Sequence, residues 1–278
     1  MKKFLVHVHV FYNQMYYELK KYLFNIREYN ADYIFTFVEE YTSIFEDIKK
    51  TFKNSKILVV PNLGYDLGPF IYVLNKVVLD EYSYIIKLHT KRDLPVYNPF
   101  SLYKGQRWRN FLLSFIKTES NFDKVIQCLE KNSNIGMHGS CAFILNKKYD
   151  GNSSRHYFED YLLQRNLPLI DYSFVAGTIF VVRASLMKML QDLNLDIKNF
   201  EFPDLSHKSV QFAHVIERLC GYIVLAQGYK IVDCTYNMDS HYIYSILNVY
   251  RTLCDFLNFF IIPLKKIVKK CLLSVKKL

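Results

Sequence analysis

Two short polar stretches, each placed directly after an apolar run, hold the side chains best suited to chemistry. The first is residues 62–70 (NLGYDLGPF), and the second is residues 89–92 (HTKR). The cations of Lys91 and Arg92, together with the His89 imidazole, suit a phosphate group, above all beside a helix N-terminus, where backbone N–H groups are unpaired. These stretches therefore predict an anion-binding crevice at one edge of a sheet.

Strand and helix patterns alternate through the first half of the chain and would position these residues. Residues 4–11, 33–38, 57–60 and 84–88 follow strand patterns, and residues 14–27, 41–52 and 67–79 follow helix patterns. This alternation predicts an α/β fold with a mostly parallel central sheet and helices on both faces. The third and fourth strands then deliver the two polar stretches to the same edge.

The second half of the chain contains no internal repeat and no low-complexity linker. Helices are predicted at residues 107–116, 122–131, 157–164, 184–193 and 210–219, and strands at 135–138, 174–182, 222–226 and 230–234. We expect one compact domain over residues 1–240. Residues 241–278 have a different, basic and amphipathic composition, which predicts a helical C-terminal tail.

The composition is that of an ordered globular protein with little net charge on its main domain. The 278 residues carry a net charge of +10, and because residues 256–278 hold six lysines and no acid, +4 remains on the rest. A nucleic-acid-binding domain would show a basic stripe, so no nucleic-acid partner is expected. The six cysteines form no C-x-x-C pair, which predicts reduced thiols in a cytoplasmic protein. Neither a secretory signal nor a membrane span of about eighteen apolar residues is expected.

Five motifs resemble, in order, those of the rhamnan synthesis protein F family of bacterial polysaccharide enzymes. They are residues 8–12 (VHVFY), 62–70 (NLGYDLGPF), 87–91 (KLHTK), 174–178 (FVAGT) and 213–221 (AHVIERLCG). The resemblance covers residues 4–235. It implies a glycosyltransferase with the A-type fold (GT-A) and a Rossmann-like nucleotide-sugar half. Such an enzyme would move a sugar, with rhamnose as one candidate, from a nucleotide-sugar donor to a rhamnan, O-antigen of lipopolysaccharide, or capsule.

The resemblance implies a donor site at the carboxyl ends of the first, third and fourth strands. The residues expected to contact the nucleotide and its phosphates are Phe11, Tyr12, Asn62, Gly64, Asp66, Lys87, His89, Lys91 and Arg92. Phe11 and Tyr12 would pack on the nucleobase, with packing in the apolar core as the alternative. Asp66 has two compatible roles, as a helix N-cap worth about 1 kcal/mol or as a contact to the ribose or base. Gly64 indicates a tight turn.

A leaving diphosphate requires nearby positive charge. In the A-type pattern the strand end at residues 88–92 carries a carboxylate pair that holds Mg²⁺ or Mn²⁺. This chain has His-Thr-Lys there, so the cofactor is unknown, and direct pairing of phosphate with Lys91 and Arg92 is preferred to a metal. Asp239 and His241 are weak candidates for a metal site. The alternative without function is a solvated Lys-Arg pair after the strand.

Transfer with inversion requires a base that takes the proton of the acceptor hydroxyl. Glu217 and Asp204 rank equally as candidates for this base, and His214 ranks behind them. His214 and Glu217 lie three residues apart and so share one face of the predicted helix. The alternative role of Glu217 is an ion pair with Arg218. The residues expected near the sugar or acceptor are Trp108, Arg109, Ala176, Gly177 and Thr178.

The tail suits the inner face of the plasma membrane. Its apolar stripe could enter the bilayer surface, and each lysine would add at most about 1 kcal/mol on an anionic membrane. A helical hairpin that closes the main domain is the alternative. A membrane location fits a lipid-linked glycan acceptor. The rival function is a noncatalytic glycan- or nucleotide-binding partner in the same pathway.

Overall fold

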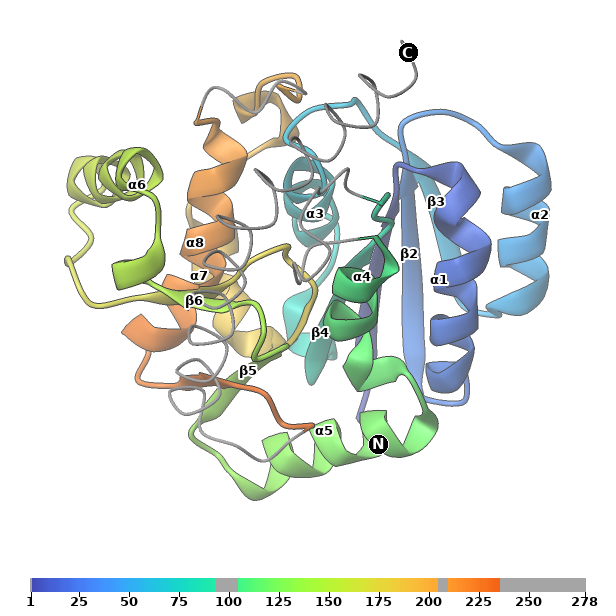
Figure 1. The fold of residues 1–278 in the computed structure, drawn as a ribbon. Coiled ribbons are helices and arrows are strands. Elements are labelled where there is room, and N and C mark those ends of the chain that lie inside the picture. Colours follow the sequence, from blue (N-terminus) through green and yellow to red (C-terminus); the bar gives the residue numbers. More distant parts are fainter. Residues whose placement is uncertain (1, 94–104, 205–209, 236–278) are drawn as a thin grey trace, which may run out of the picture.

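A seven-stranded sheet forms the centre of the protein in a computed structural model that describes residues 2–93, 105–204 and 210–235 (Figure 1). In spatial order the strands are β3 (Ser55–Val59), β2 (Ala31–Phe37), β1 (Phe4–Val10), β4 (Tyr84–His89), β8 (Phe180–Arg183), β5 (Ile135–Gly139) and β9 (Lys230–Val232). Adjacent strands run parallel except at β8, which is antiparallel to β4 and to β5. The predicted α/β fold with a mostly parallel sheet is therefore confirmed. Strands β6 (Ile144–Asn146) and β7 (Ser173–Val175) form a separate antiparallel pair.

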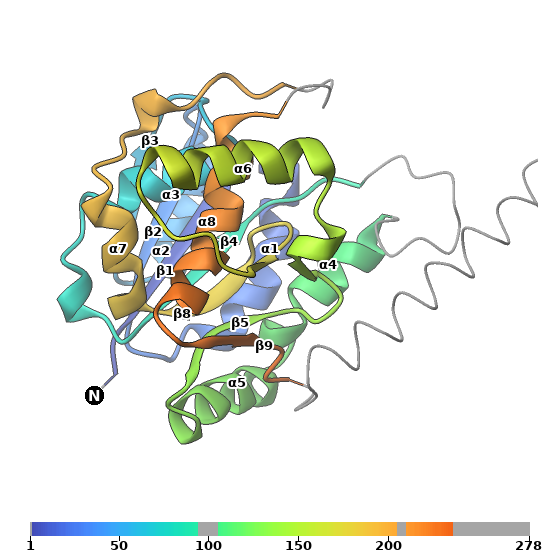
Figure 2. The ribbon, with the colours of Figure 1, turned by 90° about the vertical axis from the view of Figure 1, so that its left-hand side faces the viewer.

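Helices cover both faces of the sheet, as the alternating pattern predicted. Their bounds are α1 (Tyr16–Leu23), α2 (Thr42–Thr51), α3 (Leu67–Leu74), α4 (Gln106–Leu112), α5 (Glu119–Lys131), α6 (Asn152–Gln164), α7 (Lys188–Asp192) and α8 (Phe212–Ala226). One apolar core lies between the sheet and α1, α2, α4 and α5, and the other lies between the sheet and α3, α7 and α8. Helix α6 packs on the outside of α8 (Figure 2).

The prediction of a strand at residues 222–226 is wrong, because α8 continues to Ala226. Tyr222, Ile223 and Val224 are buried at consecutive positions, so their pattern does not distinguish a helix from a strand. Gly221 does not end the helix. A Cβ on it would lie 2.0 Å from the Ser173 carbonyl oxygen and 2.7 Å from the Phe174 Cα. The glycine is therefore required for the close approach of α8 to β7.

The strand predicted at residues 174–182 is divided into β7 and β8 by a turn. Gly177 and Thr178 both adopt left-handed backbone conformations, with φ of +86° and +53°. This conformation is easy for glycine and costs threonine about 1–2 kcal/mol. The turn moves the chain from the small sheet into the main one.

Several other helix boundaries also differ from the predictions; for example, α6 begins at Asn152 rather than at residue 157. Helix α3 ends at Leu74 rather than at residue 79, and the Asn75 side chain donates to the Leu195 carbonyl, 2.6 Å away. The helix predicted at residues 184–193 begins as a 3₁₀ helix (Ala184–Met187) and becomes α-helical only in α7.

Within the ranges that the structure describes, no helix is both long enough and apolar enough to cross a bilayer. The tail at residues 241–278 and the two metal candidates Asp239 and His241 lie outside the described residues, so their predictions stay untested.

Candidate functional site

A strip of polar side chains crosses three adjacent strands on the face of the sheet that α3 covers. In β1 and β4, apolar residues that alternate with the strip pack into the opposite core. The cross-strand register pairs His7 with Lys87 and His9 with His89, and pairs His9 with Thr36 on the other side. All five side chains of this polar strip are buried. Buried polar side chains normally require hydrogen-bond partners, so a strip of five of them indicates a candidate functional site.

Thr36 links the two histidines of β1. Its hydroxyl lies 2.9 Å from Nε2 of His7 and 3.0 Å from Nδ1 of His9. Since a hydroxyl has one proton, it donates to one imidazole and accepts from the other. Burial lowers the pKa of His7 well below its usual range and that of His9 to about 4, so both rings are neutral. In the described part of the chain, Nε2 of His9 has no hydrogen-bond partner.

Lys87 of the polar strip forms an ion pair with Asp66, the residue before α3. The ammonium donates to Oδ2 of Asp66 and to the Thr178 carbonyl, 3.1 Å away, and the Thr178 hydroxyl donates to the same Oδ2. Burial opposes ionisation of Asp66, but the positive charges facing it, those of His89 when protonated, Lys87 and Lys91, hold its pKa well below its usual range. Asp66 occupies the N-cap position of α3, yet its side chain makes no capping hydrogen bond. The expectation that it caps the helix is therefore wrong for the side chain.

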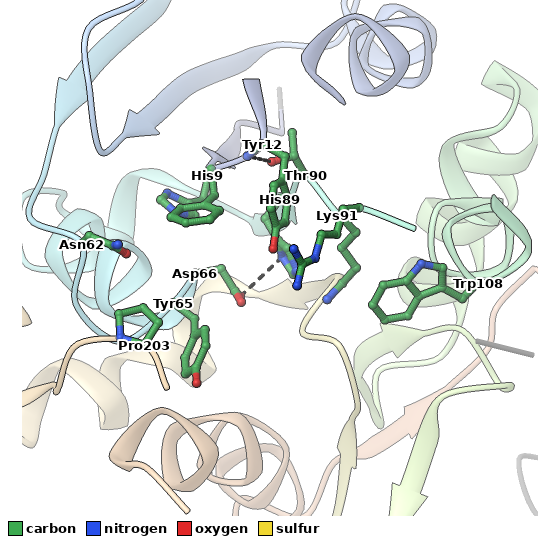
Figure 3. A pocket seen from close by; sticks show the side chains of 12 residues that line it. His9, Tyr12, Asn62, Tyr65, Asp66, His89, Thr90, Lys91, Trp108 and Pro203 are labelled. Carbon is green, nitrogen blue, oxygen red and sulfur yellow. Dashed lines mark hydrogen bonds and ion pairs between the residues drawn. The ribbon is translucent and has the colours of Figure 1, made fainter. Parts of the chain in front are cut away.

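A cavity of about 180 Å³, here called cavity A, opens beside this pair at the carboxyl ends of β1 and β4 (Figure 3). Its lining consists of His9, Phe11, Tyr12, Asn62, Tyr65, Asp66, His89, Thr90, Lys91, Arg92, Trp108 and Pro203. Asn62, His9 and Pro203 lie on one side of Asp66, and Lys91 and Trp108 lie on the other. The cavity therefore has an uncharged end and a cationic end.

The cationic end is held by aromatic rings. The Lys91 ammonium lies 4.7 Å from the centre of the Trp108 ring, and the Arg92 guanidinium lies 5.6 Å from that of Tyr12. Burial lowers the pKa of Lys91, which the nearby carboxylates of Asp66 and Glu217 oppose. The Tyr12 backbone N–H donates to the Thr90 hydroxyl at 2.9 Å and ties the end of β1 to that of β4. These contacts position both cations toward a common space.

The uncharged end contains polar atoms without partners. Besides His9 Nε2, the buried Oδ1 of Asn62 lacks a hydrogen bond within the described ranges. The same holds for both ring nitrogens of His89, which lies between this end and Lys91 (Figure 3). Nδ1 of His89 lies 3.4 Å from Asp66, and burial lowers the pKa of its imidazole well below the usual range. Buried groups of this kind are normally satisfied. The cavity thus presents hydrogen-bonding capacity that a ligand can use.

A second cavity of about 180 Å³, cavity B, adjoins the first and shares Tyr65, Asp66 and Lys91 with it. Its other lining residues are Leu67, Gly177, Thr178, Ala213, His214 and Glu217. The Glu217 carboxylate accepts the Gly177 N–H at 2.8 Å and an N–H of Arg218 at 3.3 Å. Arg218 itself is paired mainly with the buried Asp150. Glu217 is therefore fixed in place while it still faces the cavity.

The residues of cavity A do not fit a divalent metal. Among its described lining residues Asp66 is the one carboxylate, and its Oδ2 already accepts two hydrogen bonds. Lys91 and Arg92 place positive charge beside it, whereas Mg²⁺ and Mn²⁺ require several oxygen ligands. Nowhere in residues 2–93, 105–204 and 210–235 do three or more His, Cys, Asp or Glu side chains gather in a metal-binding arrangement.

A family model described as rhamnan synthesis protein F matches residues 1–229. The chain belongs to the rhamnan synthesis protein F family. This result confirms the resemblance inferred from the five motifs. The chain is also 25% identical over 175 residues to an uncharacterized protein, WxcX, of two strains of Xanthomonas campestris pv. campestris, a match that covers 61% of this chain and 24% of the relative. Among solved structures, that of S. aureus TarS 1–349 is similar with a TM-score of 0.39 at 10% identity, covering 72% of this chain and 52% of that one, a likeness too distant to carry an argument.

Several of the site residues predicted from the family motifs meet around the two cavities. Phe11, Tyr12, Asn62, Asp66, His89, Lys91, Arg92 and Trp108 line cavity A, and Gly177, Thr178, His214 and Glu217 line cavity B with Asp66 and Lys91. Lys87 lies behind Asp66 and reaches neither cavity directly. Gly64 forms the turn before α3 with φ of +68°, where a Cβ would meet the Phe200 ring. Ala176 packs between the two apolar cores.

Two further predicted residues, like Lys87, Gly64 and Ala176, line neither cavity. The Arg109 guanidinium forms a two-pronged ion pair with Glu18, at 2.9 and 3.1 Å, and a further one with Asp93. The backbone of Asp204 accepts the Tyr65 hydroxyl at 3.1 Å and donates to the Gln211 side chain at 2.9 Å.

Four residues that line cavity A were not among the predicted site residues, namely His9, Tyr65, Thr90 and Pro203, and in cavity B Leu67 and Ala213 were not predicted either. His9 was detectable, because it shares its strand face with His7 and stands nearer the carboxyl end.

Proposed function

We propose that this protein is a glycosyltransferase that moves a sugar from a nucleoside diphosphate donor to a growing surface polysaccharide of the rhamnan, O-antigen or capsule class. Cavity A carries the proposal, because it combines an uncharged, partly aromatic end with a cationic end at the carboxyl edge of parallel strands. Membership of the rhamnan synthesis protein F family supports the polysaccharide class. The parallel order of β3, β2, β1 and β4 supports an A-type fold.

The donor nucleotide lies along cavity A in this proposal. Its nucleoside occupies the uncharged end near Phe11, where Asn62 Oδ1 and His9 Nε2 gain hydrogen bonds with the base or ribose. Its diphosphate lies against Lys91 and Arg92. Charge-assisted hydrogen bonds of this kind are about twice as strong as neutral ones. They stabilise the diphosphate further as negative charge develops on it.

The transferred sugar then lies at the junction of the two cavities, beside Asp66 and Lys91, and the acceptor hydroxyl enters cavity B. The bond between the sugar's anomeric carbon and the diphosphate oxygen breaks, and its electron pair leaves with the diphosphate. A bond forms between that carbon and the acceptor oxygen, whose proton passes to the Glu217 carboxylate. The Gly177 N–H holds this carboxylate in position at 2.8 Å.

The structure favours Glu217 over Asp204 as this base. Glu217 lines cavity B, whereas Asp204 lines neither cavity and contributes backbone groups to Tyr65 and Gln211. His214 also lines cavity B, but its Nδ1 accepts the Gln211 backbone N–H at 2.9 Å, so Nε2 carries the ring proton when the imidazole is neutral. His214 is thus a donor to a bound sugar rather than a base.

One observation favours the noncatalytic alternative, a nucleotide- or glycan-binding partner. The end of β4 carries His89, Thr90 and Lys91 where a metal-dependent transferase would hold carboxylates, and the Asp66 carboxylate is already paired. A protein of this kind would bind donor nucleotides without turnover. The experiment below separates the two.

The lipid-linked acceptor and the inner membrane face are also part of the proposal. They rest on the sequence of residues 241–278. Binding of the full chain to vesicles rich in anionic lipid, and not to neutral vesicles, would support this part.

Thermal unfolding with a panel of nucleoside diphosphates and their parent nucleosides tests the proposal. A ligand at a hundredfold excess over its Kd stabilises the folded protein by about 2.7 kcal/mol, which raises Tm by several degrees. We expect one diphosphate to do so and Lys91→Ala to abolish the shift. Lys53→Ala, at an exposed position just after the end of α2, is the matched control and keeps the shift.

Turnover of the corresponding nucleotide sugar is then measured with and without a chelator. Turnover that survives chelation supports the cationic site. Binding without turnover for any sugar donor supports the noncatalytic partner. If no nucleoside diphosphate raises Tm, cavity A is not a nucleotide site and the proposal fails.

A further inference from the structure

The buried ammonium of Lys87 is surrounded by groups that stabilise a positive charge. Its exposed fraction is 0%, and it contacts the Asp66 carboxylate and, at 3.1 Å, the Thr178 carbonyl oxygen. The ring centres of Phe70 and Phe180 lie 5.5 and 5.9 Å from the nitrogen, within the range of cation–π attraction. A carboxylate, a carbonyl and two aromatic faces thus surround one fixed positive charge.

The turn between β7 and β8 contacts both members of the ion pair. Thr178 offers its carbonyl to Lys87 and its hydroxyl to Asp66. It does so from a left-handed conformation with φ of +53°, which a threonine rarely adopts. Strained backbone of this kind persists where the surroundings enforce it, and it clusters at functional sites.

Of the two members of this pair, Asp66 is the one that lines the cavities. The Asp66 side chain is 16% exposed and lines both cavities, whereas Lys87 lines neither. An unpaired Asp66 carboxylate would stand beside Lys91 and repel a diphosphate. Because Lys87 compensates it, the net charge that a ligand meets at this end comes from Lys91 and Arg92.

Fold stability does not account for the pair. Two ions lose more hydration on burial than their attraction commonly returns, and apolar residues of similar volume often replace such pairs without loss of stability. Every other residue of β4 except His89 is apolar or aromatic, so an apolar residue would suit position 87 as core. The pair is therefore better explained by the cavity that Asp66 faces.

We propose that Lys87 is a positioning residue of the donor site: its buried ammonium fixes the Asp66 carboxylate and cancels its charge, so that a nucleoside diphosphate meets Lys91 and Arg92 without an opposing anion. This inference rests on the proposed function, since it takes a nucleoside diphosphate as the ligand of cavity A. It assigns to a covalently attached ammonium the charge compensation that a bound divalent cation would otherwise supply.

Calorimetric binding to the full chain tests the inference, with the tightest nucleoside diphosphate of the panel and its parent nucleoside as probes. Lys87→Met removes the compensating charge, and we expect diphosphate binding to weaken at least about tenfold while nucleoside binding stays within about twofold. Asp66→Asn removes the opposing charge, and we expect diphosphate binding that is equal or tighter. High salt should shrink both effects.

The contrast between these two effects distinguishes an electrostatic role from a structural one. A purely structural pair would make both substitutions weaken both probes alike, and that result overturns the inference, as does wild-type diphosphate affinity in Lys87→Met. If Lys87→Met does not fold, the double variant Asp66→Asn/Lys87→Met replaces it, because it removes both charges and leaves the pair neutral, as in the wild type. The inference requires the double variant to bind the diphosphate nearly as tightly as the wild type, and diphosphate binding at least about tenfold weaker overturns it.

The outcome also separates this inference from the function on which it rests. Absence of diphosphate binding to the wild-type chain refutes the donor site as a whole. Wild-type binding that neither substitution alters refutes only the role of Lys87.

Discussion

Acidification from pH 7 to pH 5 should destabilise this protein through the neutral histidines of its polar strip. His9 is 2% exposed, and burial lowers its pKa from 6.5 to about 4, with a further lowering from Lys87 and an opposing effect of Asp66. Between these two values the unfolded chain binds a proton that the folded chain does not. The stabilisation is therefore complete above pH 6.5 and is lost as the pH falls toward 4.

The magnitude follows from the size of this pKa difference. For His9 alone, a pKa of about 4 in the folded state predicts a loss of about 2 kcal/mol in the free energy of unfolding at pH 5 relative to pH 7. His7 and His89 shift in the same direction and add to it. Urea unfolding at the two pH values measures the loss.

His9→Asn should reduce the loss of unfolding free energy between pH 7 and pH 5 by about the 2 kcal/mol assigned to His9, because an asparagine amide does not titrate. The amide can still reach the Thr36 hydroxyl, so the hydrogen bond is kept. His156→Asn, at an exposed position of α6, is the control and should leave the dependence unchanged. If wild type and His9→Asn lose the same free energy between pH 7 and pH 5, His9 is not buried as a neutral ring and the reasoning about the polar strip is wrong.

Three further outcomes can be checked. Glu217→Gln should lower kcat about 10²- to 10⁴-fold with little change in donor affinity, because the Gln amide oxygen still accepts the Gly177 N–H but cannot take a proton; a normal kcat would exclude Glu217 as the base. Chelation should leave donor binding to cavity A unchanged in calorimetry, and binding lost with chelator and restored by Mg²⁺ would contradict the misfit of its residues to a metal. Gly221→Ala should destabilise the fold by at least about 2 kcal/mol in urea, because the new Cβ meets rigid backbone of β7. Gly151→Ala, whose Cβ meets nothing within 4 Å, should cost at most about 1 kcal/mol as the N-cap of α6, and equal losses for the two variants would refute the close approach of α8.

Local patterns were sufficient to predict much of the sheet. Valines that alternate with His7 and His9 identify β1, and Ile86 and Leu88 around Lys87 do the same for β4. The position of the polar stretches at strand ends followed from that alternation, and it located most of cavity A.

Pairings across the sequence could not be predicted in the same way. The register that sets His7 beside Lys87 depends on how two strands align, and no local pattern encodes it. Asp66 was expected as a cap or a ligand contact, but its ion pair with Lys87 and its bond from Thr178 join residues 21 and 112 positions apart. The prediction of a strand at residues 222–226 was wrong for another reason. An apolar run without a polar face shows neither helical nor strand periodicity.

Gly177 and Thr178, the two left-handed residues between β7 and β8, contact side chains of both cavities. Gly177 holds the Glu217 carboxylate of cavity B, while Thr178 holds both Asp66 and Lys87 beside cavity A. A displacement of this short turn therefore moves the proposed base and the proposed donor site together. Since coupling between two sites is reciprocal, a nucleotide that pulls on Asp66 should change how tightly an acceptor binds, and the acceptor should change nucleotide affinity by the same factor.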